Sequence, residues 1–405
     1  MTPAEARLVD TQHVLLVTPE RRDDPRLQGF FGAAFVIDGR DVHQPDLARK
    51  TVYLCGDLSV LGALDLASAA RVFVLDEPSH GEPSRLASYP RVSVGRAPVG
   101  VHGVGVLFPR FFDAGGEHFH RVCAEHVFQS LTESTKPGTA HRTGIYLTPV
   151  TQDGDDLHFR LLRCSTNLSG PTENFRATDR AIVDALRREA DTLFEGAAPL
   201  NHVLAQVYRN TPATAEQRQS KARISAHADK TKDMPAHGIM AFCTFYDRLD
   251  GLRPLSSDPF DLGHRETSAL TRLRFRLKAP AVDGAGRSLP EQFSVTLYPD
   301  SVFFVPLSTN RLYTHEIQAP ALDAARLPTR LGYVVRCSKA EAVHRDGRTF
   351  LKTDAGLVPL APATDEGMAA LRARYADENR SQATIDYGDR FDFSMNQGDY
   401  RAPRP

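Results

Sequence analysis

The sequence predicts an α+β protein in which a mixed front half precedes an all-β second half. Three observations support this class. Short apolar runs alternate with polar turns over residues 1–110, and one clear amphipathic helix lies before residue 200. From about Val203 onward, many short strand-like runs are separated by turn residues. Segments of this kind form a sandwich, a barrel or a double-sheet jelly roll.

The composition is that of an ordinary globular protein. Of the 405 residues, 41% are hydrophobic and 24% are charged, which is enough apolar side chain for a core and too little charge for a disordered chain. The net charge of −1 does not indicate a nucleic-acid coat or a membrane-surface protein. We find no membrane-length apolar run and no signal-peptide pattern. The five cysteines are far apart, so we expect reduced thiols and a cytoplasmic protein.

The front half is expected to contain both strands and helices. A short helix is predicted over 59–70, an amphipathic helix over 117–132, and a longer helix over 181–194 capped by Thr178 or Asp179. Residues 144–151 and 157–164 flank a turn and predict a hairpin. Five further runs are predicted to be strands: 13–17, 33–37, 52–55, 72–75 and 104–108.

The second half is expected to supply the sheets. The predicted strands are 203–208, 223–228, 238–246, 271–278, 294–298, 302–306, 312–317, 331–336 and 349–352. We therefore divide the chain into an N-terminal α/β extension (1–140), a jelly-roll domain with a covering helix (141–360), and a C-terminal helix with a polar tail (361–405).

Metal-ligand pairs occur several times, so their context decides between them. The chain contains His80/Glu82, His227/Asp229, His264/Glu266 and His344/Asp346. Residues i and i+2 of a strand point to one face, so a pair on a strand can offer two ligands to one ion. Only His227 and Asp229 lie at the end of a predicted strand, whereas the other pairs fall in polar loops or at a hairpin tip.

A third ligand and a cation for a carboxylate follow in the same region. His315 ends a predicted strand, and two histidines with one carboxylate form the facial triad of non-haem Fe(II) oxygenases. That triad leaves three positions open for a bidentate oxo-acid and dioxygen. Arg330 and Arg336 are six residues apart, so both point to one face of a strand and can offer a guanidinium to a carboxylate.

These residues resemble the AlkB-like branch of the Fe(II)/2-oxoglutarate-dependent dioxygenases. The resemblance covers about residues 200–355 and rests on His227-Ala-Asp229-Lys, His315 and the Arg330-x5-Arg336 spacing. Gln206-Val-Tyr208 occupies the place of the family's Asn-x-Tyr. The gap between Asp229 and His315 is longer than is typical, with insertions at 249–270 and 282–290.

The resemblance implies a fold and a set of roles. The fold would be a double-stranded β-helix, a jelly-roll variant. His227, Asp229 and His315 would be the catalytic metal ligands for Fe(II). Arg330 and Tyr208 would bind the far carboxylate of the cosubstrate 2-oxoglutarate, and Arg336 would lie near its keto-acid end or the substrate. The enzyme would consume dioxygen and release succinate and CO2.

The substrate is open at this stage. We expect oxidation of a small or medium polar molecule, since the chain is neutral overall and its front half is long enough to roof the open end of a jelly roll and close the pocket. One alternative is oxidation of a nucleic-acid base, and another is a non-enzymatic binding protein on a jelly-roll scaffold. A groove for nucleic acid would need clustered cations. The candidates are Lys221, Arg223, Lys230, Lys232, Arg272, Arg274 and Arg276.

Two other segments contain chemically interesting side chains. The predicted helix at 117–132 contains His118, His120, Cys123 and His126. Their spacing does not fit a zinc ribbon or finger, so we interpret them as part of a plain amphipathic helix, with a structural metal as the alternative. Residues 164–175 form a polar loop that we predict to contact the substrate, with capping and turn residues as the plainer interpretation. Its polar candidates are Asn167, Thr172 and Asn174.

Overall fold

The largest sheet of the molecule has nine strands. The computed structural model describes residues 5–38, 45–61, 64–81, 84–132, 139–163, 168–284, 286–388 and 391–405. The strands of this major sheet run in the order β13-β10-β15-β25-β17-β23-β8-β7, and β9 also pairs with β10. Their bounds are β7 (Val99–Val101), β8 (Gly105–Phe108), β9 (Gln129–Thr132), β10 (Thr139–Thr148), β13 (Glu173–Asn174), β15 (His202–Tyr208), β17 (Ile239–Asp247), β23 (Ser301–Pro306) and β25 (Thr329–Arg336).

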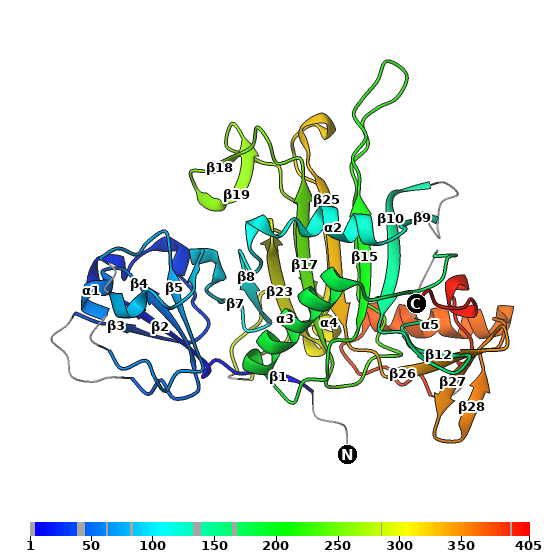
Figure 1. Cartoon of the computed structure of the whole chain (residues 1–405). Coiled ribbons are helices and arrows are strands. Elements are labelled where there is room, and N and C mark those ends of the chain that lie inside the picture. Colours follow the sequence, from blue (N-terminus) through cyan, green and yellow to red (C-terminus); the bar gives the residue numbers. More distant parts are fainter. Residues whose placement is uncertain are drawn as a thin grey trace.

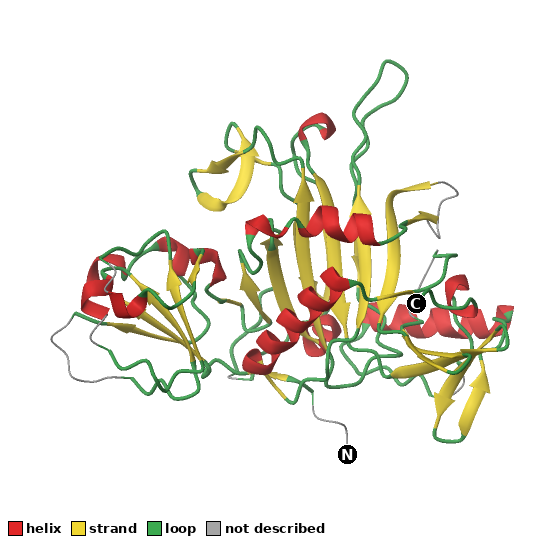
Figure 2. Cartoon of the chain, viewed as in Figure 1, coloured by secondary structure: helices red, strands yellow, loops and turns green. Residues whose placement is uncertain are grey.

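A smaller antiparallel sheet faces the major sheet. Its order is β16-β24-β21-β22, with β16 (Ile224–His227), β21 (Arg272–Leu277), β22 (Gln292–Thr296) and β24 (Tyr313–Gln318). Phe242 and Phe303 of the major sheet pack against Leu273 and Phe275 of the minor sheet in one core. Two sheets around a shared core are the layers of a jelly roll. The mixed, strand-rich α+β class is confirmed, and Figure 2 shows how few helices accompany the strands.

Two helices cover the outer face of the major sheet (Figure 1). They are α2 (His118–Glu125) and α3 (Ala177–Leu193). The stripe of α3 that includes Ile182 and Leu186 is buried against this face. The predicted helix 181–194 is confirmed, but it begins earlier than expected. Asp179 accepts the backbone N–H of Arg176 from the first turn instead of preceding the helix.

The prediction of one helix over 117–132 is wrong in its second half. The helix α2 ends at Glu125, His126 has an extended backbone, and Gln129–Thr132 form β9. The physical reason is the imidazole of His126, whose two nitrogens are held by Glu173 and Asp179. These two hydrogen bonds hold His126 in an extended backbone conformation, so the helix ends before it.

The N-terminal region forms a separate parallel sheet of five strands. Its order is β3-β2-β4-β5-β6, with β2 (His13–Val17), β3 (Ala33–Val36), β4 (Thr51–Cys55), β5 (Arg71–Leu75) and β6 (Arg91–Val92). This sheet lies beyond the β7 edge of the major sheet (Figure 1), and Phe30 forms a β-bridge to Val99 of β7. The segments from β7 to β9 belong to the major sheet, so the parallel sheet ends at β6 within the predicted 1–140 unit.

The short helix predicted over 59–70 is also much shorter than expected. It is α1 (Leu58–Leu61), a single turn. The Asp65 side chain accepts the backbone N–H of Ala67 at 3.0 Å. A local side-chain bond of this kind competes with helical hydrogen bonding.

The remaining elements form two small sheets and two helices. Residues 249–270, the expected first insertion, include a three-stranded sheet. A further five-stranded sheet combines β11 and β12, which precede α3, with β26, β27 and β28, which follow β25. Beside them, β1 and β14 form a short pair that joins the N-terminus to the end of α3. No helix in the described ranges is long and apolar enough to cross a membrane. The bounds are β1 (Arg7–Leu8), β11 (Thr151–Asp153), β12 (Asp156–Leu161), β14 (Phe194–Glu195), β18 (Arg253–Leu255), β19 (Asp258–His264), β20 (Thr267–Ser268), α4 (Leu307–Leu312), β26 (Ala340–Arg345), β27 (Arg348–Thr353), β28 (Gly356–Pro359) and α5 (Asp365–Arg380).

Candidate metal centre

The minor sheet brings together the three predicted metal ligands. In the pairing of β16 with β24, His227 lies directly opposite His315. Asp229 follows two residues after His227, and its Oδ1 is 3.6 Å from His227 Nε2 and 4.0 Å from His315 Nε2. The three ligand atoms all lie within 4.8 Å of one another. His227 and His315, 88 positions apart in sequence, therefore converge because they are paired on two neighbouring strands.

The protonation of the three side chains suits a divalent metal. The Nδ1–H of His227 donates to the backbone oxygen of Ser225 at 2.9 Å, which leaves Nε2 free to act as a ligand. Burial lowers the pKa of His315 to about 3, so its imidazole is neutral. Two neutral imidazoles and one carboxylate are the donor set of non-haem Fe(II) sites, so the residues fit the metal that the sequence predicts.

Arg336 fixes the second oxygen of the Asp229 carboxylate. Its Nη2 is 2.7 Å from Asp229 Oδ2, on the side away from the histidines. Burial, the largest single effect, would raise the pKa of Asp229, but the Arg336 guanidinium and the two histidines together outweigh it and hold that pKa well below its usual range. The resemblance placed Arg336 near the keto-acid end or the substrate, whereas its hydrogen bond in the structure is to Asp229.

Two helices hold the backbone that carries the metal ligands. Asn310 of α4 clamps Asp229 from both sides: its Oδ1 accepts the backbone N–H at 2.7 Å, and its Nδ2 donates to the backbone oxygen at 2.9 Å. From α5, Asn379 accepts the N–H of Ala228 at 2.7 Å, and Glu378 accepts the N–H of Thr231 at 3.0 Å. The sequence did not reveal these supports. No local pattern links α5 to a strand about 150 residues earlier.

A second element of the site is a buried guanidinium on β25. Arg330 pairs across the ladder with Tyr208 of β15, and its guanidinium carbon is 3.9 Å from the centre of the Tyr208 ring. The Tyr208 hydroxyl donates to Gln206 Oε1 at 2.9 Å. Arg330 is 5% exposed, and its Nε and Nη2 have no hydrogen-bond partner among the described residues. Buried donors are normally satisfied, so this pair of nitrogens is arranged for an anion such as a carboxylate.

The histidines and the cysteine of the 117–132 segment do not come together in the described structure, but His126 lies with Glu125 and Asp179 in a second group whose ligand atoms are all within 4.8 Å of one another. His118 packs between Phe112 and Phe245, while His120 faces Asp247. His126 is bonded through Nδ1 to Glu173 at 2.9 Å and through Nε2 to Asp179 at 2.7 Å. Burial opposes the charge of His126, but these two carboxylates outweigh it and raise its pKa to about 9. In this arrangement His126 is a protonated imidazole bridging two carboxylates, and the alternative of a structural metal requires the loss of that proton.

The polar loop at 164–175 is described only in part. Residues 164–167, which include Asn167, lie outside the described residues. Asn174 exchanges two hydrogen bonds with the backbone of Val150, and Thr172 is buried. Leu168 belongs to a buried cluster with Tyr146 of β10. The contacts of the described polar residues are those of turn and packing residues, and the substrate contact stays a prediction.

Comparisons with known proteins give limited information. No family model matches the sequence, and no curated protein matches it. One similar solved structure is SnoN, a non-heme alpha ketoglutarate dependent epimerase from nogalamycin biosynthesis, at 15% identity and a TM-score of 0.33, covering 65% of this chain and 92% of that one. Another is OsALKBH1, at 13% identity and a TM-score of 0.32, covering 57% and 97%. Scores at this level carry no argument about this chain, and the site must be interpreted from its own residues.

Proposed function

We propose that this chain is an Fe(II)/2-oxoglutarate-dependent dioxygenase. The observation that carries the proposal is the combination of a His227, Asp229 and His315 ligand set with the unpartnered, buried guanidinium of Arg330. Either feature alone has a plainer explanation. Together they provide a metal site and a carboxylate site on facing sheets of one core, which is what a metal-bound oxo-acid requires.

The chain's own residues have distinct tasks in this proposal. His227, Asp229 and His315 would hold iron, which when bound supplies the activation of dioxygen that is coupled to conversion of 2-oxoglutarate into succinate and CO2. Arg336 keeps the Asp229 carboxylate oriented, with Oδ1 toward the two imidazoles. Arg330 would take the far carboxylate of 2-oxoglutarate through its two free nitrogens, and the Tyr208 ring fixes the plane of the guanidinium.

We further propose a small or medium polar molecule as the substrate. Four of the seven cations that could line a nucleic-acid groove are engaged within the protein. Lys221 donates to backbone oxygens of 320–322, Lys230 and Lys232 bind Asn379 and Asp233, and Arg274 faces Glu316. Cations held in this way are poorly placed to neutralise phosphates.

The four described cysteines are free, which supports a cytoplasmic protein.

Succinate formation from 2-oxoglutarate tests the proposed function. We expect the intact chain with Fe(II) and dioxygen to produce succinate, and His227→Ala and Asp229→Ala to abolish it while the melting temperature shows a folded protein. Arg348→Gln, an exposed change on β27, is the matched control. Full activity of either ligand variant in excess Fe(II) would remove the triad assignment.

A further inference from the structure

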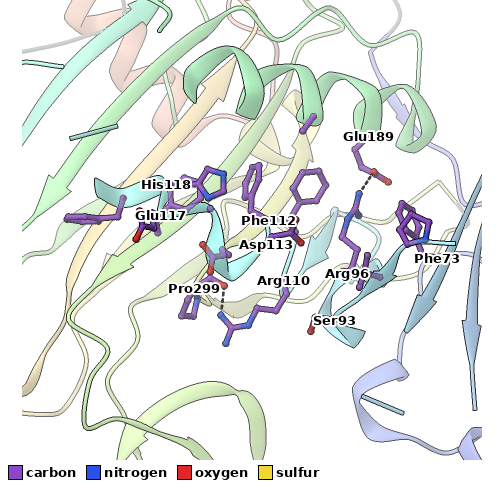
Figure 3. A pocket seen from close by; sticks show the side chains of 18 of the residues that line it. Phe73, Ser93, Arg96, Arg110, Phe112, Asp113, Glu117, His118, Glu189 and Pro299 are labelled. Carbon is purple, nitrogen blue, oxygen red and sulfur yellow. Dashed lines mark hydrogen bonds and ion pairs between the residues drawn. The ribbon is translucent and has the colours of Figure 1, made fainter. Parts of the chain in front are cut away.

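A cavity of 1230 Å³ lies between the N-terminal parallel sheet and the outer face of the major sheet (Figure 3). Its walls come from β5, the segment after β8, the start of α2, the middle of α3 and the end of β17. None of the metal ligands lines it. Phe242 of β17 contacts the His315 ring, whereas Phe245, three residues later, lines the cavity. Residues an odd number apart on a strand point to opposite faces, so the cavity and the metal centre are separated by the major sheet.

The deep wall of this cavity has more positive than negative charge. Arg71, Arg96 and Arg110 line it, and the carboxylate of Glu189 is shared by the first two of these at 3.0 and 2.7 Å and by His13 at 3.2 Å. The Arg96 side chain is 12% exposed, and its Nη1 is buried without a hydrogen-bond partner in the described part of the chain. One carboxylate therefore serves several cations, and a guanidinium nitrogen remains unsatisfied.

Arg110 extends this positive wall. Its Nη1 donates to the backbone oxygen of Pro299 at 2.6 Å, as Figure 3 shows. Burial lowers the pKa of Arg110, and burial also raises the pKa of the neighbouring Asp300 to about 6. At neutral pH a carboxyl with this pKa is still mostly ionised, so Asp300 offsets part of the positive charge. The three guanidiniums of the wall then face two carboxylates, those of Glu189 and Asp300. The remaining acids, Glu77, Asp113 and Glu117, are exposed, and so are the two further cations, Arg91 and Arg188.

Flat aromatic surfaces form the opposite part of the cavity. Phe112 and His118 lie beside each other with ring centres 5.0 Å apart, and His118 is stacked on Phe245 at 5.1 Å. Burial lowers the pKa of His118, so its ring is neutral, and its Nδ1 has no partner among the described residues. Such a surface accepts a planar apolar group and one hydrogen-bond acceptor.

We propose that this cavity is a second ligand site that binds a small aromatic molecule carrying a carboxylate or phosphate group. The anionic group would lie against Arg96 and Arg110, and the ring would pack on Phe112 and His118. The proposal does not depend on the function of the metal centre, because the two sites share no described residue and lie on opposite faces of the major sheet.

Calorimetric titration of the full chain tests the proposal. Phenyl phosphate and benzoate are the probes for the two anionic groups, inorganic phosphate tests the charge alone, and benzyl alcohol tests the ring alone. We expect one aromatic anion to bind at least tenfold more tightly than inorganic phosphate and benzyl alcohol. The preferred probe identifies the anionic group.

Variants then locate the bound probe. Arg110→Gln is expected to weaken binding at least tenfold, Arg96→Gln likewise, and Arg348→Gln should leave it unchanged. If either Arg variant fails to fold, as judged by its melting temperature, His118→Gln replaces it with the same expected loss. Binding that survives these changes, absence of binding by both aromatic anions, or displacement of the probe by 2-oxoglutarate would each overturn the second site. A variant that loses succinate formation but still binds the probe would bear on the proposed dioxygenase function and not on the second ligand site.

Discussion

At the scale of single residues, Arg330 and Tyr208 fit together only because Gly332 has no side chain. A Cβ at Gly332 would lie 2.8 Å from Arg330 Nη1 and 3.2 Å from Tyr208 Cε2. Real Cβ atoms do not approach this closely, so a methyl group would displace the guanidinium. The proposed carboxylate site therefore depends on three residues of neighbouring strands, and Gly332 is the one that the sequence analysis did not identify.

We predict that Gly332→Ala lowers the affinity for 2-oxoglutarate about tenfold or more, or about 1.4 kcal/mol. The affinity for Mn(II), used as a redox-inert substitute for Fe(II), should stay unchanged because the metal ligands are on other strands. Gly284→Ala is the control, since an added Cβ there meets nothing within 4 Å. Equal 2-oxoglutarate affinity in both variants would show that the guanidinium is not held by this contact.

A second residue-scale prediction concerns the shape of the cation. Lysine keeps the charge of Arg330 but has no forked pair of donors, so Arg330→Lys should not be conservative. We expect the apparent affinity for 2-oxoglutarate to fall about tenfold or more, by about 1.4 kcal/mol or more. Competition assays with 2-oxoglutarate measure this directly. An unaltered dependence on 2-oxoglutarate would move the carboxylate contact to another residue.

At the scale of elements, the segment 228–231, which follows β16 and includes the proposed ligand Asp229, is supported by helices that come later in the sequence. The α4 residue Asn310 and the α5 residues Glu378 and Asn379 together satisfy backbone groups of residues 228–231. The Lys278 ammonium donates to the backbone oxygens of Asn310 and Glu378, which ties both helices to the end of β21. The C-terminal helix α5 thus helps to hold the backbone of the candidate metal centre.

We predict that Asn379→Ala weakens Mn(II) binding about tenfold while the protein stays folded. The substitution leaves the N–H of Ala228 without its acceptor, and an unmade hydrogen bond of this kind costs about 1–3 kcal/mol. Without this hydrogen bond, the backbone at Ala228 is held less firmly, so the neighbouring ligands His227 and Asp229 should be less well oriented for the metal. Arg372→Ala, on the exposed side of α5, is the control. Unchanged Mn(II) affinity in Asn379→Ala would limit α5 to a general stabilising role.

His126 links three elements, and its charge gives the fold a pH dependence. It bonds to Glu173 and Asp179, and the Tyr333 hydroxyl of β25 donates to Asp179 at 2.8 Å. The pKa of His126 is raised from 6.5 in the unfolded chain to about 9 in the folded protein. A raised folded-state pKa means that the contribution is complete below pH 6.5 and is lost as the pH rises through about 9.

We therefore predict that, between pH 6.5 and about 9, the free energy of unfolding falls more steeply in the natural protein than in His126→Gln. The difference should approach about 3 kcal/mol, as expected for a shift of this size. Urea unfolding at a series of pH values measures it. Parallel pH profiles for the two proteins would mean that His126 is not protonated in the fold.

At the scale of the whole molecule, the N-terminal sheet does not cover the metal centre. The long front half led us to expect a roof over the open end of the jelly roll. The parallel sheet instead lies beyond β7, at the edge of the major sheet farthest from β10 and β13 (Figure 1). Of the front half, β9, β10 and β13 extend the sheet beside β15. Of these strands, β10 is the one that pairs with Tyr208, through Arg142.

We predict no tight binding of DNA or RNA oligonucleotides at physiological salt. The candidate groove cations are largely engaged internally, and the chain has a net charge of −1. Nucleic-acid binding depends on neutralising several phosphates and weakens steeply with salt. Fluorescence anisotropy with labelled oligonucleotides measures this. Micromolar or tighter affinity with a strong salt slope would favour the nucleic-acid alternative.

Local patterns predicted the ligands but not their supports. His227, Asp229, His315, Arg330 and Arg336 could be proposed as site residues because strand periodicity and ligand spacing are short-range signals. The extended conformation at His126 was missed because it depends on carboxylates about 50 residues away. The role of Asn379 and the position of the parallel sheet also depend on contacts between distant segments. No spacing rule in a single sequence reports such contacts.

The most direct test of the central claim is anaerobic calorimetry of 2-oxoglutarate binding with and without Mn(II). The joint site of His227, Asp229, His315 and Arg330 predicts that 2-oxoglutarate binds well only to the metal-loaded chain. It also predicts that Asp229→Ala loses metal and 2-oxoglutarate binding together, whereas Arg330→Lys retains the metal and loses most 2-oxoglutarate affinity. Binding of 2-oxoglutarate that is equally strong without metal, or in Asp229→Ala, would contradict the claim.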